Sequence, residues 1–161
     1  MNRQYSDAER VVWLVDRDCC PNTAAVARIG GTIDEHALRV ALNWLQKRHS
    51  MLRTRVDVLG GRAPVAPEAE TNPPIQLRIE DRTGNEQWEG EARFELDQPL
   101  PFTRGPLVSA VVLKSDEVSE LILTLRHVYG DTASVLCWTM PGRVTQSWWL
   151  VSTGSAGTPP K

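Results

Sequence analysis

Two apolar segments joined by a short polar turn restrict the fold most strongly. Residues 107–113 and 120–125 are rich in leucine and valine, and residues 114–117 (KSDE) separate them. Runs of this length and composition are typical of strands inside a sheet, and a short polar connection favours antiparallel pairing. The sequence therefore predicts a β-hairpin whose second strand delivers the chain to His127.

Two segments carry the Ser/Thr-x-x-Glu pattern that often begins a helix. These are residues 6–9 (SDAE) and 32–35 (TIDE), and apolar periodicity follows each of them. After the second, apolar residues recur at spacings of three and four, so we expect an amphipathic helix over about residues 33–49. Between the two helix starts, residues 24–29 (AAVARI) predict a strand that ends at Gly30-Gly31.

The middle of the chain contains three further segments with readable patterns. Partial alternation over residues 52–59, closed by Gly60-Gly61, predicts a strand. Residues 62–74 hold four prolines and predict an exposed connection, after which residues 75–79 (IQLRI) alternate as a half-buried strand. A polar helix is expected around Trp88.

The last 24 residues differ in character from the rest of the chain. Residues 138–161 contain three of the six tryptophans and end in a segment rich in glycine, serine, threonine and proline. We interpret residues 1–137 as one domain and residues 138–161 as a poorly ordered tail, with a binding peptide as the alternative for the tail.

Composition sets several expectations about partners and location. A net charge of −2 with scattered basic residues gives no footprint for nucleic acid. The apolar runs fall short of the roughly 20 residues that a membrane span needs, and the N-terminal residues lack a secretory apolar region. We therefore expect no membrane span, no nucleic-acid partner and a cytoplasmic location.

Cysteine and histidine spacing argues against a structural metal or a disulfide framework. Cys19 and Cys20 are adjacent, which leaves Cys137 as the only distant partner. The three histidines lie far apart in sequence, and no Cys-x-x-Cys occurs, so we expect no metal site.

Three local motifs, in order, resemble those of one enzyme family. Residues 48–55 (RHSMLRTR) resemble an RHxxLRTxF segment, residues 94–97 (FELD) with 105–107 (GPL) resemble an F-x-L-x-x-GPL segment, and residues 126–132 (RHVYGDT) resemble HHxxxDG. Over about residues 5–136 the chain therefore resembles the condensation domains of nonribosomal peptide synthetases and, through them, the chloramphenicol acetyltransferase-like acyltransferases.

The resemblance implies a fold and an activity. The expected fold is α+β, the N-terminal subdomain of a chloramphenicol acetyltransferase-like protein, with helices packed on a mostly antiparallel sheet. The implied reaction is acyl transfer, or amide or ester formation, in secondary-metabolite or lipid biosynthesis. The donor would be a phosphopantetheine thioester on an acyl or peptidyl carrier protein, or a coenzyme A thioester, with no bound cofactor.

The resemblance also assigns roles to three residues. His127 would be the general base that deprotonates the attacking amine or hydroxyl, a role that suits an imidazole pKa near neutrality. Asp131 would support the loop through a partly buried ion pair with Arg53. The alternative for His127 is an ordinary hydrogen-bonded polar residue, which is common for a single histidine at a strand end. The sequence identifies no residues that would contact the thioester donor.

The chain departs from the family pattern in ways that define an alternative. Arg126 stands where the family has its first histidine, and Thr132 stands where the family has glycine. Only the first of two family halves is recognisable, so a second-half polypeptide is an expected partner. Without one, we expect an incompletely covered sheet and self-association. The alternative function is a catalytically silent, truncated interaction module.

Overall fold

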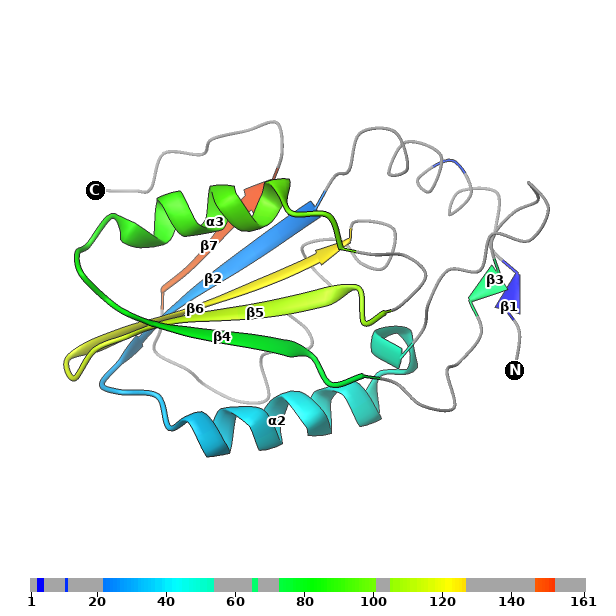
Figure 1. Ribbon diagram of the computed structural model, residues 1–161, viewed down its shortest axis with the longest axis horizontal. Helices are drawn as coiled ribbons and strands as arrows, with labels where there is room; N and C mark the ends of the chain where they lie inside the picture. The colour runs from blue at the N-terminus through cyan, green and yellow to red at the C-terminus, as the bar shows by residue number, and fades with distance from the viewer. Residues whose placement is uncertain are drawn as a thin grey trace.

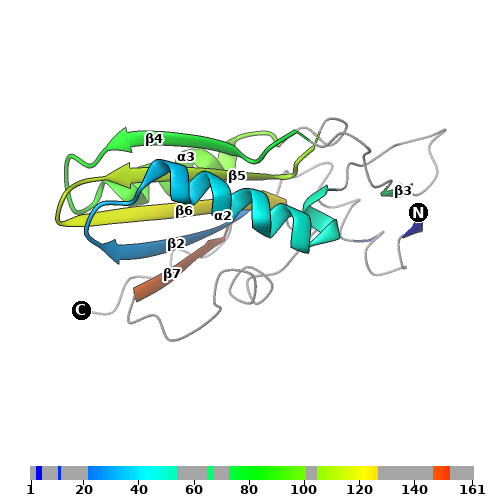
Figure 2. The same cartoon turned by 90° about the horizontal axis from the view of Figure 1, so that it is seen from below.

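The computed structural model describes residues 3–4, 11, 22–53, 65–66, 73–100, 105–126 and 147–152. A five-stranded sheet lies between two helices, one on each face (Figures 1 and 2). The strands of this sheet are β2 (Asn22–Gly30), β4 (Gln76–Asp81), β5 (Val108–Lys114), β6 (Val118–Arg126) and β7 (Ser147–Ser152). The helices are α2 (Glu35–Arg48), α3 (Gln87–Asp97) and the short 3-10 helix η1 (Ser50–Arg53).

The strand order in the sheet is β4-β5-β6-β2-β7. Strand β4 runs parallel to β5, and the three remaining neighbour pairs are antiparallel. A separate pair joins β1 (Arg3–Gln4) to β3 (Val65–Ala66). The expected α+β fold with a mostly antiparallel sheet is therefore confirmed.

The predicted hairpin is present and forms the centre of the sheet. Strands β5 and β6 pair antiparallel from Val108↔Leu125 to Leu113↔Glu120. Ser115 closes the turn, because its hydroxyl donates to the carbonyl oxygen of Val118 at 2.6 Å. Nearly every residue of both strands is buried, as expected for the interior of a sheet covered on both faces.

Each face of the sheet has its own apolar core. The core under α2 consists of Ala25, Leu42, Leu52, Ile75, Val108, Ala110, Leu123 and Leu125. The core under α3 consists of Ala24, Val26, Trp88, Ala92, Leu96, Val111, Leu113 and Ile122. Neighbouring residues of one strand contribute to opposite cores, which is the alternation that a strand imposes. Both faces thus carry a helix, and the expectation of an incompletely covered sheet stays a prediction.

Helix α2 begins two residues later than the capping pattern indicated. Its N-cap is Asp34, whose carboxylate accepts a hydrogen bond from the backbone N–H of Ala37 at 2.6 Å, so Thr32 does not cap the helix. The first predicted helix falls on residues outside the described ranges, apart from Val11.

The strand predicted over residues 52–59 is wrong at its start. Leu52 and Arg53 belong to the 3-10 helix η1, and residues 54–59 lie outside the described ranges. Leu52 is nevertheless buried, as the apolar pattern required. The short helix places this leucine in the apolar core under α2.

The C-terminal region differs from the expected tail at one segment. Residues 147–152 form β7, which pairs antiparallel with β2 from Arg28↔Ser147 to Thr23↔Ser152. The other residues of the predicted tail lie outside the described ranges, as does the expected boundary at residue 137. In the described part of the chain, neither the length nor the apolarity of any helix suffices to span a membrane.

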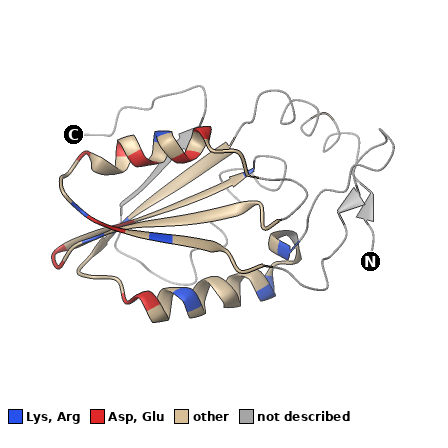
Figure 3. Cartoon of the chain, in the orientation of Figure 1, with Lys and Arg blue, Asp and Glu red and all other residues tan. Residues whose placement is uncertain are grey.

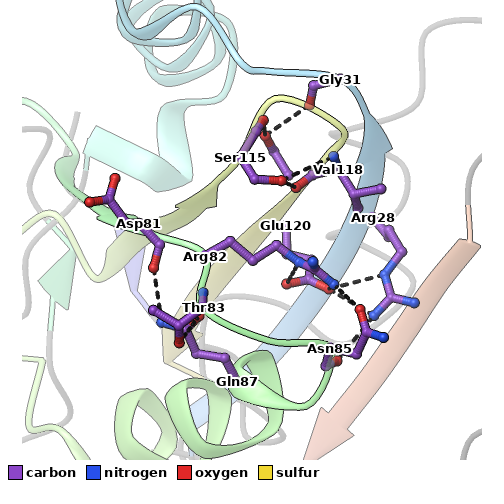
Figure 4. A network of polar contacts seen from close by, with 11 residues as sticks. Arg28, Gly31, Asp81, Arg82, Thr83, Asn85, Gln87, Ser115, Val118 and Glu120 are labelled. Carbon is purple, nitrogen blue, oxygen red and sulfur yellow. Dashed lines mark hydrogen bonds and ion pairs between the residues drawn. The ribbon is translucent and has the colours of Figure 1, made fainter.

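A buried carboxylate joins three segments at the turn end of the sheet (Figure 4). The Glu120 side chain is fully buried, and its Oε1 accepts hydrogen bonds from Arg28 at 3.0 and 2.7 Å. Its Oε2 accepts from Nε of Arg82 at 3.1 Å. Arg82 in turn donates to Asn85 Oδ1 at 2.7 Å, just before α3. This network fixes β2 and the β4–α3 connection to the central strand β6.

Candidate functional site

Strand β6 leads directly into the HHxxxDG-like motif, and its last residue is firmly held. Arg126 is 3% exposed, its backbone N–H donates to Leu107 O at 3.1 Å, and its Nε donates to Leu100 O at 3.3 Å. Both acceptors belong to the connection between α3 and β5. Arg126, at the position where the resemblance implies a histidine, is thus a buried anchor between β6 and that connection.

Asn22 makes a second set of bonds to the same connection. It is the register partner of Arg126, and its Nδ2 donates to the carbonyls of Glu95, Leu96 and Gln98 at 3.3, 3.1 and 2.7 Å. The last carbonyls of a helix have no partner within the helix. Asn22 therefore caps α3 from a strand more than 70 residues away in sequence, a role that sequence reasoning missed.

Arg53, the predicted loop support, holds the end of α2. Its guanidinium donates to the backbone carbonyls of Gln46, at 2.8 Å, and Lys47. A cation at this position also suits the negative end of the helix dipole. Arg53 consequently has a structural role at the end of α2.

Leu52, the buried residue before Arg53, shows where η1 lies. It places η1 at the end of the sheet where strand β6 stops. Leu52 and Leu125 are members of one apolar core, 3% and 1% exposed. Arg53 follows Leu52 directly, and His127 lies two residues beyond Leu125. Figure 1 shows η1 beside the end of the sheet at which β6 stops and β5 starts.

His127, Asp131 and Thr132 lie outside the described residues. The roles of His127 and Asp131 and the ion pair between Asp131 and Arg53 therefore stay predictions. The structure describes two segments adjacent to these residues in sequence or in the predicted pair, namely the anchored end of β6 and the helix η1.

His49, in the RHxxLRT-like motif, is the C-cap of α2. Its backbone N–H donates to Leu45 O at 3.0 Å. Partial burial, and secondarily the charge of neighbouring Arg48, lower the pKa of His49 below its ordinary value. The lowered pKa favours the neutral form of the imidazole at this end of α2.

An open pocket of about 380 Å³ lies beside the C-terminal end of α3, next to the Leu100 anchor. Its polar lining includes Glu95, whose carboxylate accepts from Arg78 at 2.8 Å and from the Ser109 hydroxyl at 2.9 Å. Arg78 also pairs with Glu80 and Glu91. One guanidinium is thus shared by three carboxylates, so these hydrogen-bonded groups leave a net negative charge beside the pocket.

The F-x-L segment contributes to the same region from α3. Phe94 is 53% exposed, and the Arg78 guanidinium lies 5.7 Å from its ring centre. Among the described residues, no group of three or more His, Cys, Asp or Glu side chains could hold a metal ion.

Comparison with known proteins finds peptide synthetases of similar sequence and condensation domains of similar fold. No family model matches the chain. The chain is 28% identical over 137 residues to one of the linear gramicidin synthase proteins of Brevibacillus parabrevis, a match that covers 78% of this chain and 3% of that protein. The starter condensation domain of rhizomide synthetase superposes with a TM-score of 0.74 and 18% identity, over 86% of this chain and 35% of that one.

The chain has the fold of a condensation domain. A mutant of the rhizomide starter condensation domain, solved in complex with C8-CoA, gives a TM-score of 0.68 at 19% identity, over 80% of this chain and 31% of that one. The resemblance drawn from the three motifs is therefore confirmed. The condensation-domain-like chain spans about a third of the solved condensation domains and a few per cent of the gramicidin synthase protein.

Proposed function

We propose that this chain contributes to amide-bond formation in nonribosomal peptide synthesis, with His127 as general base. The amine acceptor attacks the carbonyl carbon of a thioester, a C–N bond forms, and the C–S bond breaks to release the thiol. His127 accepts the proton that the amine loses and returns it to the departing sulfur, so that the thiol leaves and the imidazole is neutral again. Imidazole suits this step, because its pKa lies near the working pH.

The observation that carries the proposal is the anchored end of β6. One hydrogen bond from the backbone N–H of Arg126 and one from its side chain hold the residue before His127 in place. A general base must be held within hydrogen-bonding reach of the proton it removes. A buried, hydrogen-bonded strand end can hold the following residue in a fixed position. The similarity to peptide synthetases supports amide formation as the reaction class.

The proposed donor is a thioester on a carrier protein, with a coenzyme A thioester as the simpler substitute. The complex of a starter condensation domain with C8-CoA supports the use of a coenzyme A thioester in assays. Because this chain spans only about 35% of the solved condensation domains, we propose a second polypeptide segment, resembling the remaining part, as a partner.

The alternative is a catalytically silent interaction module that keeps the fold. It is favoured by Arg126, which is buried as a structural anchor at the position where the resemblance implies a histidine. A module of this kind would bind partners without turnover.

Reconstitution distinguishes the two functions. The chain, alone and mixed with a polypeptide that supplies the remaining part of a condensation domain, is given an acyl thioester and an amine, and amide product is measured by mass spectrometry. We expect product with the mixture. The absence of product above the uncatalysed reaction in every combination would favour the silent module.

The Arg53–Asp131 pair is tested by a double-mutant cycle. Arg53→Ala alone should destabilise the chain, because the carbonyls of Gln46 and Lys47 lose their donor. If the ion pair is present, the effects of Arg53→Ala and Asp131→Ala on the free energy of unfolding should not be additive. We expect an interaction free energy of at least about 1 kcal/mol in urea unfolding. Strictly additive effects would show that Arg53 supports only α2.

A further inference from the structure

Helix α2 carries a second apolar stripe on the side away from the sheet. Its members, called here the outer stripe, are Ala37, Val40, Ala41 and Trp44, and all four are exposed. Their spacing of i, i+3, i+4 and i+7 places them on one side of the helix. The inner side, formed by Leu38, Leu42 and Leu45, already packs on the sheet core. A helix that is apolar on two sides is typical of one that is covered on two sides.

Trp44 and Val40 dominate the outer stripe. Each is 54% exposed, and the guanidinium of Arg48 lies 5.3 Å from the centre of the Trp44 ring. Tryptophan is among the residues that contribute most to protein interfaces, and a cation stacked on the ring leaves its other surface for a partner. The two alanines beside these residues leave room for a large side chain to approach the helix.

The charges at the two ends of α2 have opposite sign. Asp34 and Glu35 lie at its start, where Glu35 also pairs with Arg39, and Lys47 and Arg48 lie at its end. Figure 3 shows acidic colouring at the beginning of this helix and basic colouring at its end. An antiparallel copy of the same helix would bring the acidic end of one opposite the basic end of the other, whereas a parallel copy would place like charges together.

We propose that the outer stripe is a dimerisation surface on which α2 of a second copy of this chain packs antiparallel. The two-fold axis passes between the helices near Val40 and Ala41, the middle of the stripe. Trp44 of each copy then lies against the small side chain of Ala37 in the other. Such an interface is isologous, since the same residues contribute from both copies. The proposal is independent of the catalytic role of His127.

The dimer is weak by this geometry. One pair of helices buries less surface than the roughly 1,000 Å² that marks a stable interface. We therefore expect a dissociation constant between about 1 µM and 1 mM, which sets the concentration range for the tests.

Sedimentation equilibrium of the full chain tests the surface. Trp44→Ser should raise the dissociation constant by about tenfold or more, because it removes the main contact residue. Phe94→Ser is the matched control, since Phe94 is 53% exposed on α3, across the sheet, and its loss should leave association unchanged. Circular dichroism checks that both variants fold. A monomer up to about 1 mM, or an association that Phe94→Ser weakens and Trp44→Ser does not, would overturn the proposal.

Cross-linking tests the antiparallel orientation. The native cysteines to be replaced by serine are Cys19, Cys20 and Cys137. In that background Ala41→Cys, near the axis, should form an intermolecular disulfide under mild oxidation. Ala37→Cys should not, because its two copies lie about 10 Å apart along the helices, beyond disulfide reach. Equal cross-linking at both positions, or none at Ala41→Cys, would refute the antiparallel dimer.

Discussion

His127→Ala is expected to lower the rate of amide formation by about 10² to 10⁴. This range corresponds to roughly 3 to 5 kcal/mol of activation free energy. The expected loss is large because a general base acts only in the transition state, so its removal should lower kcat and leave substrate binding nearly unchanged. Steady-state kinetics with a thioester and an amine measure the effect.

His36→Ala is the matched control for the loss of an imidazole. His36 is exposed in the first turn of α2, which lies near the end of β2 and far from the end of β6 where His127 follows. Its replacement should leave turnover unchanged. Equal turnover by wild type, His127→Ala and His36→Ala would remove His127 from the mechanism.

The pH dependence of kcat gives a second readout for His127. A general base must be unprotonated, so the rate should fall as pH drops through the pKa of the imidazole, and this acidic limb should disappear in the residual activity of His127→Ala. An acidic limb that persists in His127→Ala would assign the titration to another group.

The part of the fold that sequence predicted is local in origin. The hairpin of β5 and β6 could be predicted because both strands and their turn follow one another directly in the chain. Helix α2 was found from its apolar spacing, but the choice of cap was ambiguous, because Thr32 and Asp34 are both good N-cap residues and only the geometry selects Asp34.

The contacts that sequence did not predict join distant segments. Asn22 caps α3 from 73 to 76 residues away, and Glu120 binds Arg28 from 92 residues away. No local pattern marks either residue as a buried hydrogen-bonding group. Strand β7 is a similar case, since its strand character depends on pairing with β2, more than 100 residues earlier.

In the candidate site, too, local patterns could be predicted from the sequence and contacts between distant segments could not. The motifs suggested Arg53, His127 and Asp131 because family motifs are local strings. Of these three residues the structure describes Arg53, and the roles of His127 and Asp131 stay predictions. The role of Arg126 as an anchor to Leu100 and Leu107 was not readable, because a charged residue at a strand end is usually exposed.

Glu120→Ala is expected to destabilise the chain by about 3 to 5 kcal/mol, the cost of removing one partner of a buried ion pair. Glu120 is fully buried, while the side chains of Arg28 and Arg82 are 34% and 13% exposed. Removal of the carboxylate leaves two cations close together without their shared acceptor. Urea unfolding followed by circular dichroism measures the change.

Glu35→Ala provides the matched control, because Glu35 also pairs with an arginine. Its partner Arg39 lies one turn away on α2 at 2.8 Å, and both side chains are at least half exposed. An exposed pair of this kind contributes less than about 1 kcal/mol, since water solvates both charges equally well apart. Glu120→Ala and Glu35→Ala therefore compare the loss of a buried and of an exposed carboxylate that pairs with arginine.

Glu120→Gln separates charge from hydrogen bonding at the same position. Glutamine keeps the size of the side chain and one carbonyl acceptor, so the loss should lie between those of Glu120→Ala and Glu35→Ala. If Glu120→Ala lowers the free energy of unfolding no more than Glu35→Ala does, water must solvate Arg28 and Arg82 when the carboxylate is removed. The network of Figure 4 would then be a consequence of the fold, because three segments that are held by their apolar cores would need no carboxylate to join them.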